Sequence, residues 1–183
     1  SRRQGQMGIR ASREWTYGYR ETDPLGGHDP YSASKACTES VSNVWRNAYH
    51  GGPLVASARA GNVFGGGDWS EDRLVPDAMR AFSEGQTLEI RSPKSERPWQ
   101  HVCEPLAAYL MILRALLEGG KAYARAWNIG PRMEQILPVE QVVSIMAETW
   151  GKDASWKVAT DKKALHEAGL LHLDVSQVMR HIG

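Results

Sequence analysis

The sequence has little of what several classes of protein require. Its 183 residues include only two cysteines, Cys37 and Cys103, which lie far apart and form neither a CxxC pair nor a Cys/His ligand spacing. This pattern indicates neither a disulfide framework nor a structural zinc site, so we expect no metal and a reducing, cytoplasmic environment. No apolar run reaches the roughly 18 residues that a membrane-spanning helix needs, and the first dozen residues lack the apolar core of a secretory signal. We therefore expect no membrane association.

An excess of charge of one sign is also missing. Lys and Arg number 22 against 21 Asp and Glu, which gives a net charge of +1. Such a balance offers no broad electrostatic footprint for nucleic acid, so we expect no nucleic-acid partner, and any phosphate must be bound locally. The chain shows no internal repeat, and its length and 42% hydrophobic content suit one domain or a large part of one.

Helix and strand patterns alternate along the chain. Apolar residues recur with helical spacing in the stretches 30–50, 73–85, 104–118 and 138–151. Short apolar or alternating runs bounded by turn residues occupy 54–60, 87–92, 99–102, 126–131 and 154–158. This alternation predicts an α/β fold with a largely parallel sheet, in which we expect Trp45, Trp127 and Trp150 to be core residues.

The first helical stretch opens with a tyrosine four residues before a lysine. Asp29 is the expected N-cap and Pro30 suits the first turn, so Tyr31 and Lys35 should lie on one helix face. A phenol has a pKa of about 10, and a nearby ammonium lowers it by stabilising the phenolate. Tyr31 is thus a candidate base for a sugar or alcohol hydroxyl in a nicotinamide-dependent oxidation. The alternative is an exposed helical pair without a catalytic role.

A glycine-rich stretch, RAGNVFGGGDW, follows the first expected strand. Gly65–Gly67 would let the backbone approach a ligand closely, and the Asn62 amide could bond a diphosphate oxygen. Arg73 and Arg97 could converge on the same diphosphate, because guanidinium groups match its oxygen geometry. The alternatives are a flexible turn and two solvated surface arginines.

The order of these motifs resembles the extended short-chain dehydrogenase/reductase superfamily, in which a Tyr-x-x-x-Lys helix is followed by a strand and an R-x-x-N-x-x-G loop. Here YSASK is followed by ARAGNVFGGG at the corresponding distance. Four stretches in the same order are more narrowly similar to the members that dehydrate a CDP-linked hexose: REWTYGYRETDPLGGHDPYSASK, ARAGNVFGGGDWSEDRLVPD, RPWQHVCEPLAAYL and WNIGP. Together they cover about residues 13–150.

The resemblance implies the C-terminal half of a Rossmann-like doubly wound parallel sheet with a small mixed α/β substrate-binding portion. Residues 13–62 would form the second half of the NAD-binding fold, and 63–183 the substrate-binding part with the remaining sheet elements. Residues 1–12 are atypical of the family. A homodimer formed through the Tyr–Lys helix is also implied.

The implied activity is the NAD-dependent dehydration of CDP-glucose to CDP-4-keto-6-deoxyglucose, a step of deoxysugar biosynthesis such as that for lipopolysaccharide O-antigen. Tyr31 would be the base at the C4 hydroxyl, and Lys35 would lower its pKa and bond the nicotinamide ribose. The implied cofactor contacts are Tyr31, Lys35, Ala60 and Val63. The implied substrate contacts are Asn62, Asp68, Arg73, Arg97 and Asn128.

Two features of the family's pattern are missing. The sequence has no GxxGxxG loop to hold the cofactor pyrophosphate. It also has RRQGQMGIRAS where the family carries a Thr-Ser-Asp-Lys type segment that supplies the acid for elimination. We therefore expect part of a longer enzyme, with residues 1–12 foreign to it, a short C-terminal tail missing and no residue to take the acid's role.

Two other functions stay open. A nucleotide-sugar 4-epimerase would share the oxidation at C4 without the elimination. A catalytically inactive remnant would keep sugar-nucleotide binding or a dimer interface. A sheet with an unpaired strand edge also predicts a marginally stable or aggregating monomer.

Overall fold

The computed structural model describes residues 15–26, 30–160 and 169–183. Residues 1–12 and Asp29, which carry two of the sequence-based expectations, lie outside these ranges. The described helices are α1 (Pro30–Ala48), α2 (Leu74–Ser83), α3 (Cys103–Gly119), α4 (Val139–Trp150) and α5 (Ser176–His181), with 3-10 helices η1 (Gly120–Tyr123) and η2 (Met133–Gln135). The described strands are β1 (Ser57–Ala60), β2 (Asn62–Phe64), β3 (Thr87–Ile90), β4 (Glu96–Arg97), β5 (Trp99–His101), β6 (Ala126–Ile129), β7 (Leu137–Pro138) and β8 (Ser155–Val158).

The described strands form four two-stranded pairs. The pairs β1–β6, β2–β5 and β3–β8 are parallel, whereas β4–β7 is antiparallel. Parallel strands need a crossover connection, and the helices between the paired strands provide it. The predicted α/β fold with largely parallel pairing is therefore confirmed.

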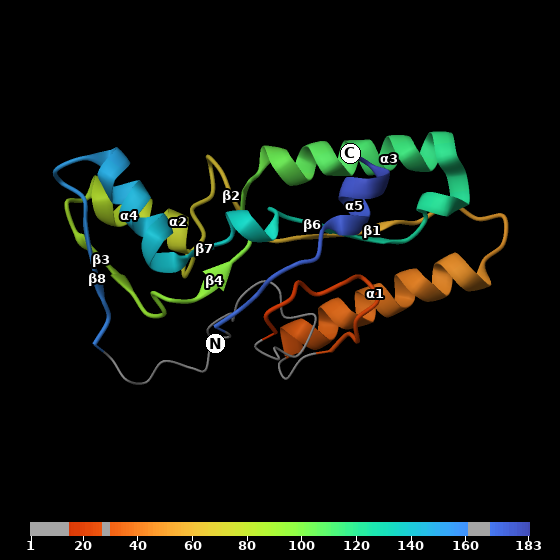
Figure 1. The fold of residues 1–183 in the computed structure, drawn as a ribbon, viewed down its shortest axis with the longest axis horizontal. Helices are drawn as coiled ribbons and strands as arrows, with labels where there is room; N and C mark the ends of the chain where they lie inside the picture. The colour runs from red at the N-terminus through yellow and green to blue at the C-terminus, as the bar shows by residue number, and fades with distance from the viewer. Residues whose placement is uncertain (1–14, 27–29, 161–168) are drawn as a thin grey trace.

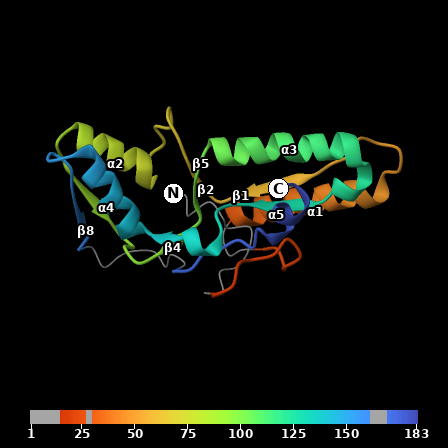
Figure 2. The same cartoon turned by 45° about the horizontal axis from the view of Figure 1, so that its top comes forward.

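The elements gather into two lobes at the ends of an elongated molecule, as Figures 1 and 2 show. In one end, which we call the α1–α3 lobe, the β1–β6 pair lies between α1 and α3, and α5 packs on β6. In the other, the α2–α4 lobe, α2 and α4 accompany the β3–β8 pair. The pairs β2–β5 and β4–β7 lie between the lobes. None of the described helices is long and apolar enough to cross a membrane.

Each lobe has its own apolar core. The buried cluster of the α1–α3 lobe consists of Ile112, Trp127, Ile129, Leu173, Val175 and Val178. The buried cluster of the α2–α4 lobe consists of Ala78, Phe82, Leu88, Ile90 and Val143. The first cluster joins α3, β6 and the C-terminal segment, and Ala56, just before β1, packs against it.

The prediction of a core position is confirmed for Trp127, which is fully buried, and wrong for two other tryptophans. Trp45 is 36% exposed and Trp150 is 44% exposed. Trp45 stacks on Tyr49 beyond the end of α1, and its Nε1 donates a hydrogen bond to the Pro53 carbonyl. The indole is thus held by a loop at the surface and not by the sheet.

Helix α1 is attached to the sheet by polar groups. Its only buried residues are Ser32 and Glu39, whereas Val41 and Val44 are exposed. The Glu39 carboxylate accepts hydrogen bonds from Arg59 Nε at 3.0 Å and from Ser57 Oγ at 2.8 Å. The apolar stripe read from the sequence therefore faces away from the sheet.

The predicted helices and five predicted strands all appear, with ends shifted by a few residues. Three strands, β2, β4 and β7, were not predicted. Asn62–Phe64, expected to belong to a glycine-rich loop, pairs with Trp99–His101. Glu96–Arg97, for which no strand was expected, pairs with Leu137–Pro138, whose proline was expected to begin a helix. These expectations were wrong because both pairings join segments that are distant in sequence.

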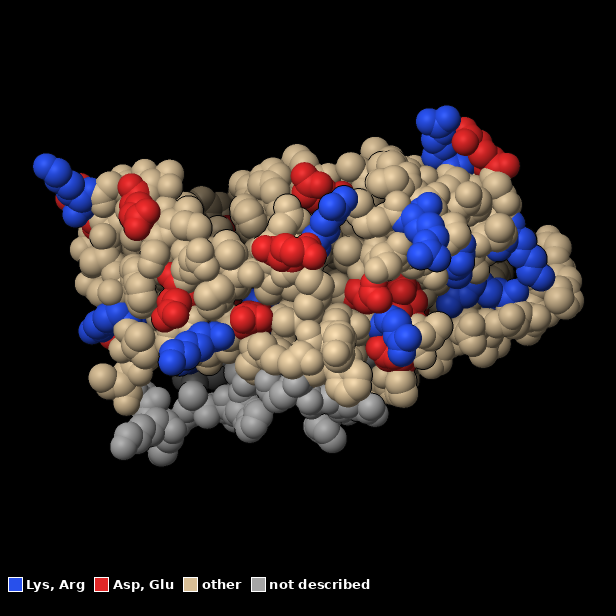
Figure 3. All heavy atoms as spheres, viewed as in Figure 1, with Lys and Arg blue, Asp and Glu red and all other residues tan. Residues whose placement is uncertain are grey.

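Acidic and basic side chains are interspersed over the face shown in Figure 3, in keeping with the balanced charge. Blue side chains gather over η1 and the carboxyl end of α1, at the right of that view. This is the end of the molecule farthest from the α2–α4 lobe.

Candidate active site

The tyrosine and the lysine meet at the start of α1. The Lys35 Nζ lies 5.6 Å from the centre of the Tyr31 ring, as the spacing of four residues predicts. Both side chains are exposed. The amino end of α1 lies at the same end of the β1–β6 pair as the carboxyl ends of those strands (Figure 1). In open α/β sheets this is the edge at which ligands bind.

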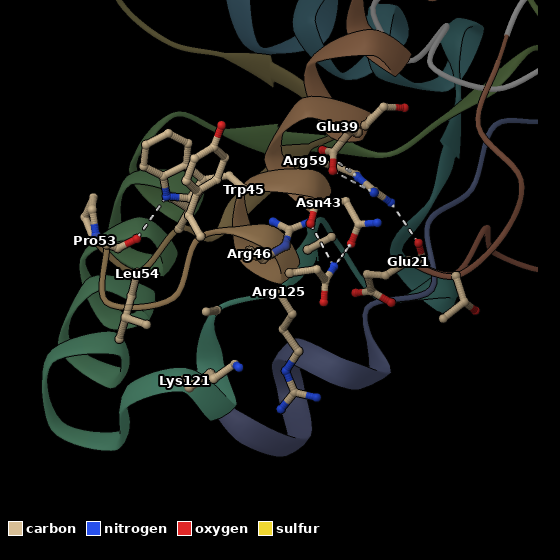
Figure 4. Close-up of a pocket in the computed structure, with 18 of the residues that line it drawn as sticks. Glu21, Glu39, Asn43, Trp45, Arg46, Pro53, Leu54, Arg59, Lys121 and Arg125 are labelled. Carbon is tan, nitrogen blue, oxygen red and sulfur yellow. Dashed lines mark hydrogen bonds and ion pairs between the residues drawn. The ribbon is translucent and has the colours of Figure 1, made fainter.

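Glu39 lies one further turn along the same helix, and its carboxylate is paired with Arg59 at 3.0 Å (Figure 4). Burial alone would raise the pKa of this carboxyl. The hydrogen bonds and charge of Arg59, together with the Ser57 hydroxyl, outweigh burial and hold the pKa below its usual value. Glu39 is thus a charged anchor that positions the helix carrying Tyr31 and Lys35.

Glu39 was missed by the sequence reasoning. Tyr31, Lys35 and Glu39 are spaced at i, i+4 and i+8, so all three lie along one side of α1. The signal that could have revealed this anchor was the position of Glu39, a carboxylate four residues after Lys35 on the same side of the helix.

Gly61, the residue between β1 and β2, lies close to the backbone of Pro98, and we call this point the strand crossing. A Cβ atom added to Gly61 would lie 2.5 Å from the Pro98 carbonyl oxygen, so no larger residue fits there. Asn62 N donates a hydrogen bond to the same oxygen at 2.9 Å. Ala60 ends β1 and Val63 lies in β2, both half-buried, so the predicted cofactor contacts flank this crossing.

Two polar atoms at the crossing have no partner. Asn62 and Trp99 are register partners in the β2–β5 pair, which places their side chains on the same face. The Asn62 Oδ1 and the Trp99 Nε1 are both buried without a hydrogen-bond partner among the described residues. Buried polar groups are normally satisfied, so an acceptor and a donor left open side by side fit a polar ligand. Trp99 was not among the site residues predicted from the sequence.

The glycine-rich turn after β2 divides into two parts. A Cβ on Gly65 would lie 2.6 Å from Val102 Cγ1, so this glycine is needed for packing against the protein and not against a ligand. Gly66 has open space around it. The exposed Asp68 accepts a hydrogen bond from Ser70 N at 3.0 Å, and hydrogen bonds from Ser70 lower the pKa of its carboxyl. Asp68 is therefore an accessible anion in the turn after β2, which we call the rim of the candidate site.

The remaining predicted contacts differ in accessibility. Arg73, just before α2, is half-buried, and its guanidinium makes no ion pair within the part of the chain that the structure describes. Arg97 is buried, and its Nη1 donates to the carbonyls of Glu96 and Gly169, which ties β4 to the C-terminal segment. Arg73 is thus the arginine that remains accessible to a diphosphate.

Asn128, which was expected to contact the nucleotide, is fully buried. Its Nδ2 donates to the Tyr19 carbonyl at 2.8 Å and to the Asp174 carbonyl at 3.2 Å. The physical reason is that two segments, one around residue 19 near the start of the chain and one around residue 174 near its end, pack over β6 at Asn128. As packed here, the side chain joins these segments and does not reach the surface.

The candidate site offers the Tyr31 phenol beside the Lys35 ammonium. It also offers the Asn62 and Trp99 polar atoms, which have no partner among the described residues, and the exposed Asp68 carboxylate. Among residues 15–26, 30–160 and 169–183, no group of three or more His, Cys, Asp or Glu is placed to hold a metal ion. Tyr31 and Lys35 are exposed at the edge where β1 ends with Ala60, so an accessible phenol and ammonium are available to the reacting end of a dinucleotide there. Val63 stays a predicted contact. A glycine-rich pyrophosphate loop for the other end of the dinucleotide does not occur in the sequence.

A Tyr-x-x-x-Lys helix beside parallel β-strands defines the class as a short-chain dehydrogenase/reductase type of α/β protein. Residues 12–130 match the sequence profile of the NAD dependent epimerase/dehydratase family, and the chain belongs to that family. The family predicted from the motifs is thereby confirmed.

Among curated relatives, the chain is 47% identical over 179 residues to the CDP-glucose 4,6-dehydratase of Salmonella typhimurium strain LT2, which covers 94% of this chain and 50% of the relative. It is 28% identical over 145 residues to the low-salt glycan biosynthesis protein Agl12 of Haloferax volcanii, covering 79% of this chain and 44% of the relative. The chain thus spans about half the length of the curated relatives it matches.

Solved structures show the same fold. DesIV, a dTDP-glucose 4,6-dehydratase from Streptomyces venezuelae with NAD and TYD bound, gives a TM-score of 0.72 at 23% identity over 91% of this chain and 49% of that chain. The UDP-glucuronic acid 4-epimerase from Bacillus cereus also gives 0.72, at 19% identity over 91% of this chain and 50% of that one. The Rossmann-like architecture is therefore confirmed, and it does not distinguish dehydratase from epimerase.

Proposed function

We propose that this chain is the base-carrying and substrate-binding part of an NAD-dependent sugar-nucleotide 4,6-dehydratase that converts CDP-glucose to CDP-4-keto-6-deoxyglucose. The single observation that carries the proposal is the 47% identity to a CDP-glucose 4,6-dehydratase along 94% of the chain. The accessible Tyr31–Lys35 pair supplies the chemistry that such an enzyme needs.

Tyr31 takes the proton of the sugar C4 hydroxyl, and the Lys35 ammonium favours the phenolate that accepts it. Bound NAD would supply the hydride acceptor for the oxidation at C4 and the hydride donor for the reduction at C6. The C4 ketone acidifies the C5 proton, which leaves with the C6 hydroxyl as water. Glu39 positions α1 through Arg59 and does not touch the substrate. No described residue is assigned to the acid that protonates the leaving hydroxyl.

The substrate side is formed by Asn62 and Trp99 at the strand crossing and by Arg73 and Asp68 at the rim. An indole N–H donates to a hydroxyl or phosphate oxygen, and the open Asn62 oxygen accepts from a sugar hydroxyl. Arg73 offers a guanidinium to the diphosphate. In this proposal the buried Arg97 and Asn128 support the site from behind by holding the C-terminal segment.

We also propose a homodimer that pairs through α1, in a cytoplasmic setting. The outward face of α1 carries the exposed Val41 and Val44, and exposed apolar side chains on one helix favour association. Cys37 and Cys103 are both free thiols, which suits a reducing compartment.

The test combines the chain with the half of the relative that it does not match. This chain is fused to the part of the Salmonella relative that it does not match, and the product formed from CDP-glucose and NAD is weighed by mass spectrometry. A dehydratase gives a product lighter by one water. Tyr31→Phe should lower kcat by about 10² to 10⁴-fold, since general acid–base catalysis contributes that much. Tyr109→Phe is the matched control, because Tyr109 on α3 is 39% exposed like Tyr31 but lies on another helix.

A product of unchanged mass with an inverted sugar centre would overturn dehydration in favour of a 4-epimerase. Equal loss of activity in both tyrosine variants would overturn the role of Tyr31. Either result leaves the family membership untouched.

A second function is supported by the length of the chain, which covers half of its relatives. On its own, the chain would bind the sugar nucleotide without turning it over. Calorimetry on the chain alone, with CDP-glucose and NAD titrated separately, tests this. Binding of CDP-glucose without NAD supports a binding remnant, and equally tight binding of both ligands contradicts it.

A further inference from the structure

A cavity of about 640 Å³ lies at the far end of the α1–α3 lobe from Tyr31. It is enclosed by the carboxyl-terminal half of α1, the loop 50–55, η1 and the start of β6 (Figure 4). None of the residues proposed to contact NAD or the sugar nucleotide lines it, whereas Glu39 and Arg59, which anchor α1, do. Its volume falls within the range of about 300 to 1,000 Å³ that is usual for small-molecule sites.

Three cations in the cavity wall have no anionic partner. Arg46 comes from α1, Lys121 from η1 and Arg125 from the residue before β6. None of them forms an ion pair with any residue that the structure describes. Arg46 Nη1 and Arg125 Nε are buried without a hydrogen-bond partner among those residues. Burial, with the charge of nearby Arg59, lowers the pKa of Arg46 despite the opposing charge of Glu39.

The carboxylates in the same wall are already engaged. Glu39 is paired with Arg59 at 3.0 Å. Glu21 Oε1 accepts a hydrogen bond from Asn128 N at 2.9 Å. The third, Asp23, accepts one from the Arg20 backbone N–H at 2.8 Å. With Glu39 paired to Arg59 and Asp23 lying 3.6 Å from Arg20, the lining leaves Arg46, Lys121 and Arg125 against the single carboxylate of Glu21, so the cavity presents a net positive charge to a ligand.

The opposite wall is aromatic and apolar. Trp45 and Tyr49 stack with their ring centres 4.6 Å apart and their planes inclined by 27°. Leu54 lies beside this pair, and Leu25 also lines the cavity. Nucleotide bases stack on such aromatic faces, whatever their identity.

We propose that this cavity is a second nucleotide site, in which Arg46, Lys121 and Arg125 hold a phosphate and the Trp45–Tyr49 pair accepts the base. Guanidinium groups match phosphate geometry, and an anion satisfies the two open N–H groups. The site lies at the amino ends of β1 and β6, away from the proposed catalytic edge. Occupation there would act on α1 from the end opposite to Tyr31.

The test titrates the whole chain with CMP and, separately, with inorganic phosphate by calorimetry. Arg46→Gln should weaken CMP binding at least tenfold, and Lys121→Gln about threefold, because Lys121 is exposed and a single screened charge contributes less. Trp45→Leu should weaken CMP but leave phosphate binding within twofold. Arg114→Gln is the matched control, because Arg114 is an exposed arginine that pairs with Glu118 on α3.

Folding of each variant is checked by its thermal transition. Arg46→Gln should melt no lower than the wild type, because it removes a buried donor that has no partner. Lys121→Gln is the second variant, because the Lys121 side chain is exposed and forms no ion pair with a described residue, so the folded state should tolerate the change.

The proposal is overturned if folded chain binds neither CMP nor phosphate. It is also overturned if CMP binding survives both Arg46→Gln and Lys121→Gln but is lost in Arg73→Gln, which would place the nucleotide at the catalytic edge. Phosphate that binds as tightly as CMP would overturn the assignment of a base to the Trp45–Tyr49 wall. None of these results depends on turnover, so failure of the proposed dehydratase activity would be recognised separately.

Discussion

The two lobes differ in how completely they bury their own apolar side chains. In the α2–α4 lobe, Phe82 of α2 and Val143 of α4 pack against Leu88 and Ile90 of β3. In the α1–α3 lobe, both long helices leave apolar side chains in solvent, with Val41 68% and Leu117 79% exposed. The lobe that carries the candidate active site is thus the one whose apolar side chains are the more exposed, since Ile145, Trp150 and Val158 of the other lobe are at most 49% exposed.

The two lobes differ in how their helices are attached to the strands as well as in how much apolar surface they expose. The α2–α4 lobe is held by an apolar core, whereas α1 is held to its sheet by the Glu39–Arg59 pair and the Ser57 hydroxyl. A charged anchor is directional, and its contribution depends on both partners staying in place. We infer that the position of Tyr31 and Lys35 depends on electrostatics, while the shape of the α2–α4 lobe depends on packing.

The largest expected effect comes from truncating the core of the α2–α4 lobe. Phe82→Ala removes a side chain that is almost fully buried and should cost about 3 to 5 kcal/mol of unfolding free energy. Hydrogen exchange should then rise at Ala159 N, which donates to the Ile90 carbonyl beside β8, and much less at Ser57 N in the other lobe. Leu117→Ala, at an exposed site of α3, is the control. Equal loss of protection in both lobes would show that they unfold as one unit.

The anchor of α1 should give the next largest effect. Glu39→Gln leaves the Arg59 guanidinium buried without its counter-charge and should destabilise the α1–α3 lobe by about 3 kcal/mol. Thermal unfolding followed by hydrogen exchange at Ser57 N measures the loss. Glu118→Gln breaks the exposed pair with Arg114 and should change stability by less than about 1 kcal/mol.

The same anchor predicts how this lobe responds to acid. The pKa of Glu39 is lowered in the folded chain, so its stabilisation is full above the usual value of 4.5 and is lost as pH falls from there through the lowered pKa. Glu39→Gln should remove this acid-dependent loss. An unchanged acid transition in the variant would contradict the anchor.

How much of this comparison could be read from the sequence depends on the range of the interactions. The helices follow from local apolar spacing, and the contact of Lys35 with the Tyr31 ring follows from a separation of four residues. The buried states of Arg97 and Asn128 do not, because residues 169 and 174, which receive their hydrogen bonds, lie far along the chain. The polar attachment of α1 was hidden for the same reason.

The outward face of α1 gives a further prediction. The double variant Val41→Lys with Val44→Lys should reduce self-association, because it places charge on an exposed apolar helix face. The unfolding free energy of the monomer should change by no more than about 0.5 kcal/mol, as for most surface substitutions. Light scattering behind size exclusion measures the mass. Ile145→Lys on α4, also an exposed site, is the control in the other lobe. Self-association that persists in the double variant would exclude α1 as the interface.

The smallest effect concerns Asp77, in the first turn of α2, and it should have the opposite sign to that of Glu39. Burial raises the pKa of the Asp77 carboxyl, and the neighbouring Arg80 offsets this only in part. Its ionised form is therefore disfavoured in the folded lobe, so this penalty disappears as pH falls through the raised pKa toward the usual value of 3.8. Acid should thus relieve the α2–α4 lobe at Asp77 while it weakens the α1–α3 lobe at Glu39. Hydrogen exchange at Ala159 N, corrected for the intrinsic rate, should show this relief in the wild type and lose it in Asp77→Asn. If both proteins respond to acid alike, the two lobes do not differ in the sign of their coupling to protons.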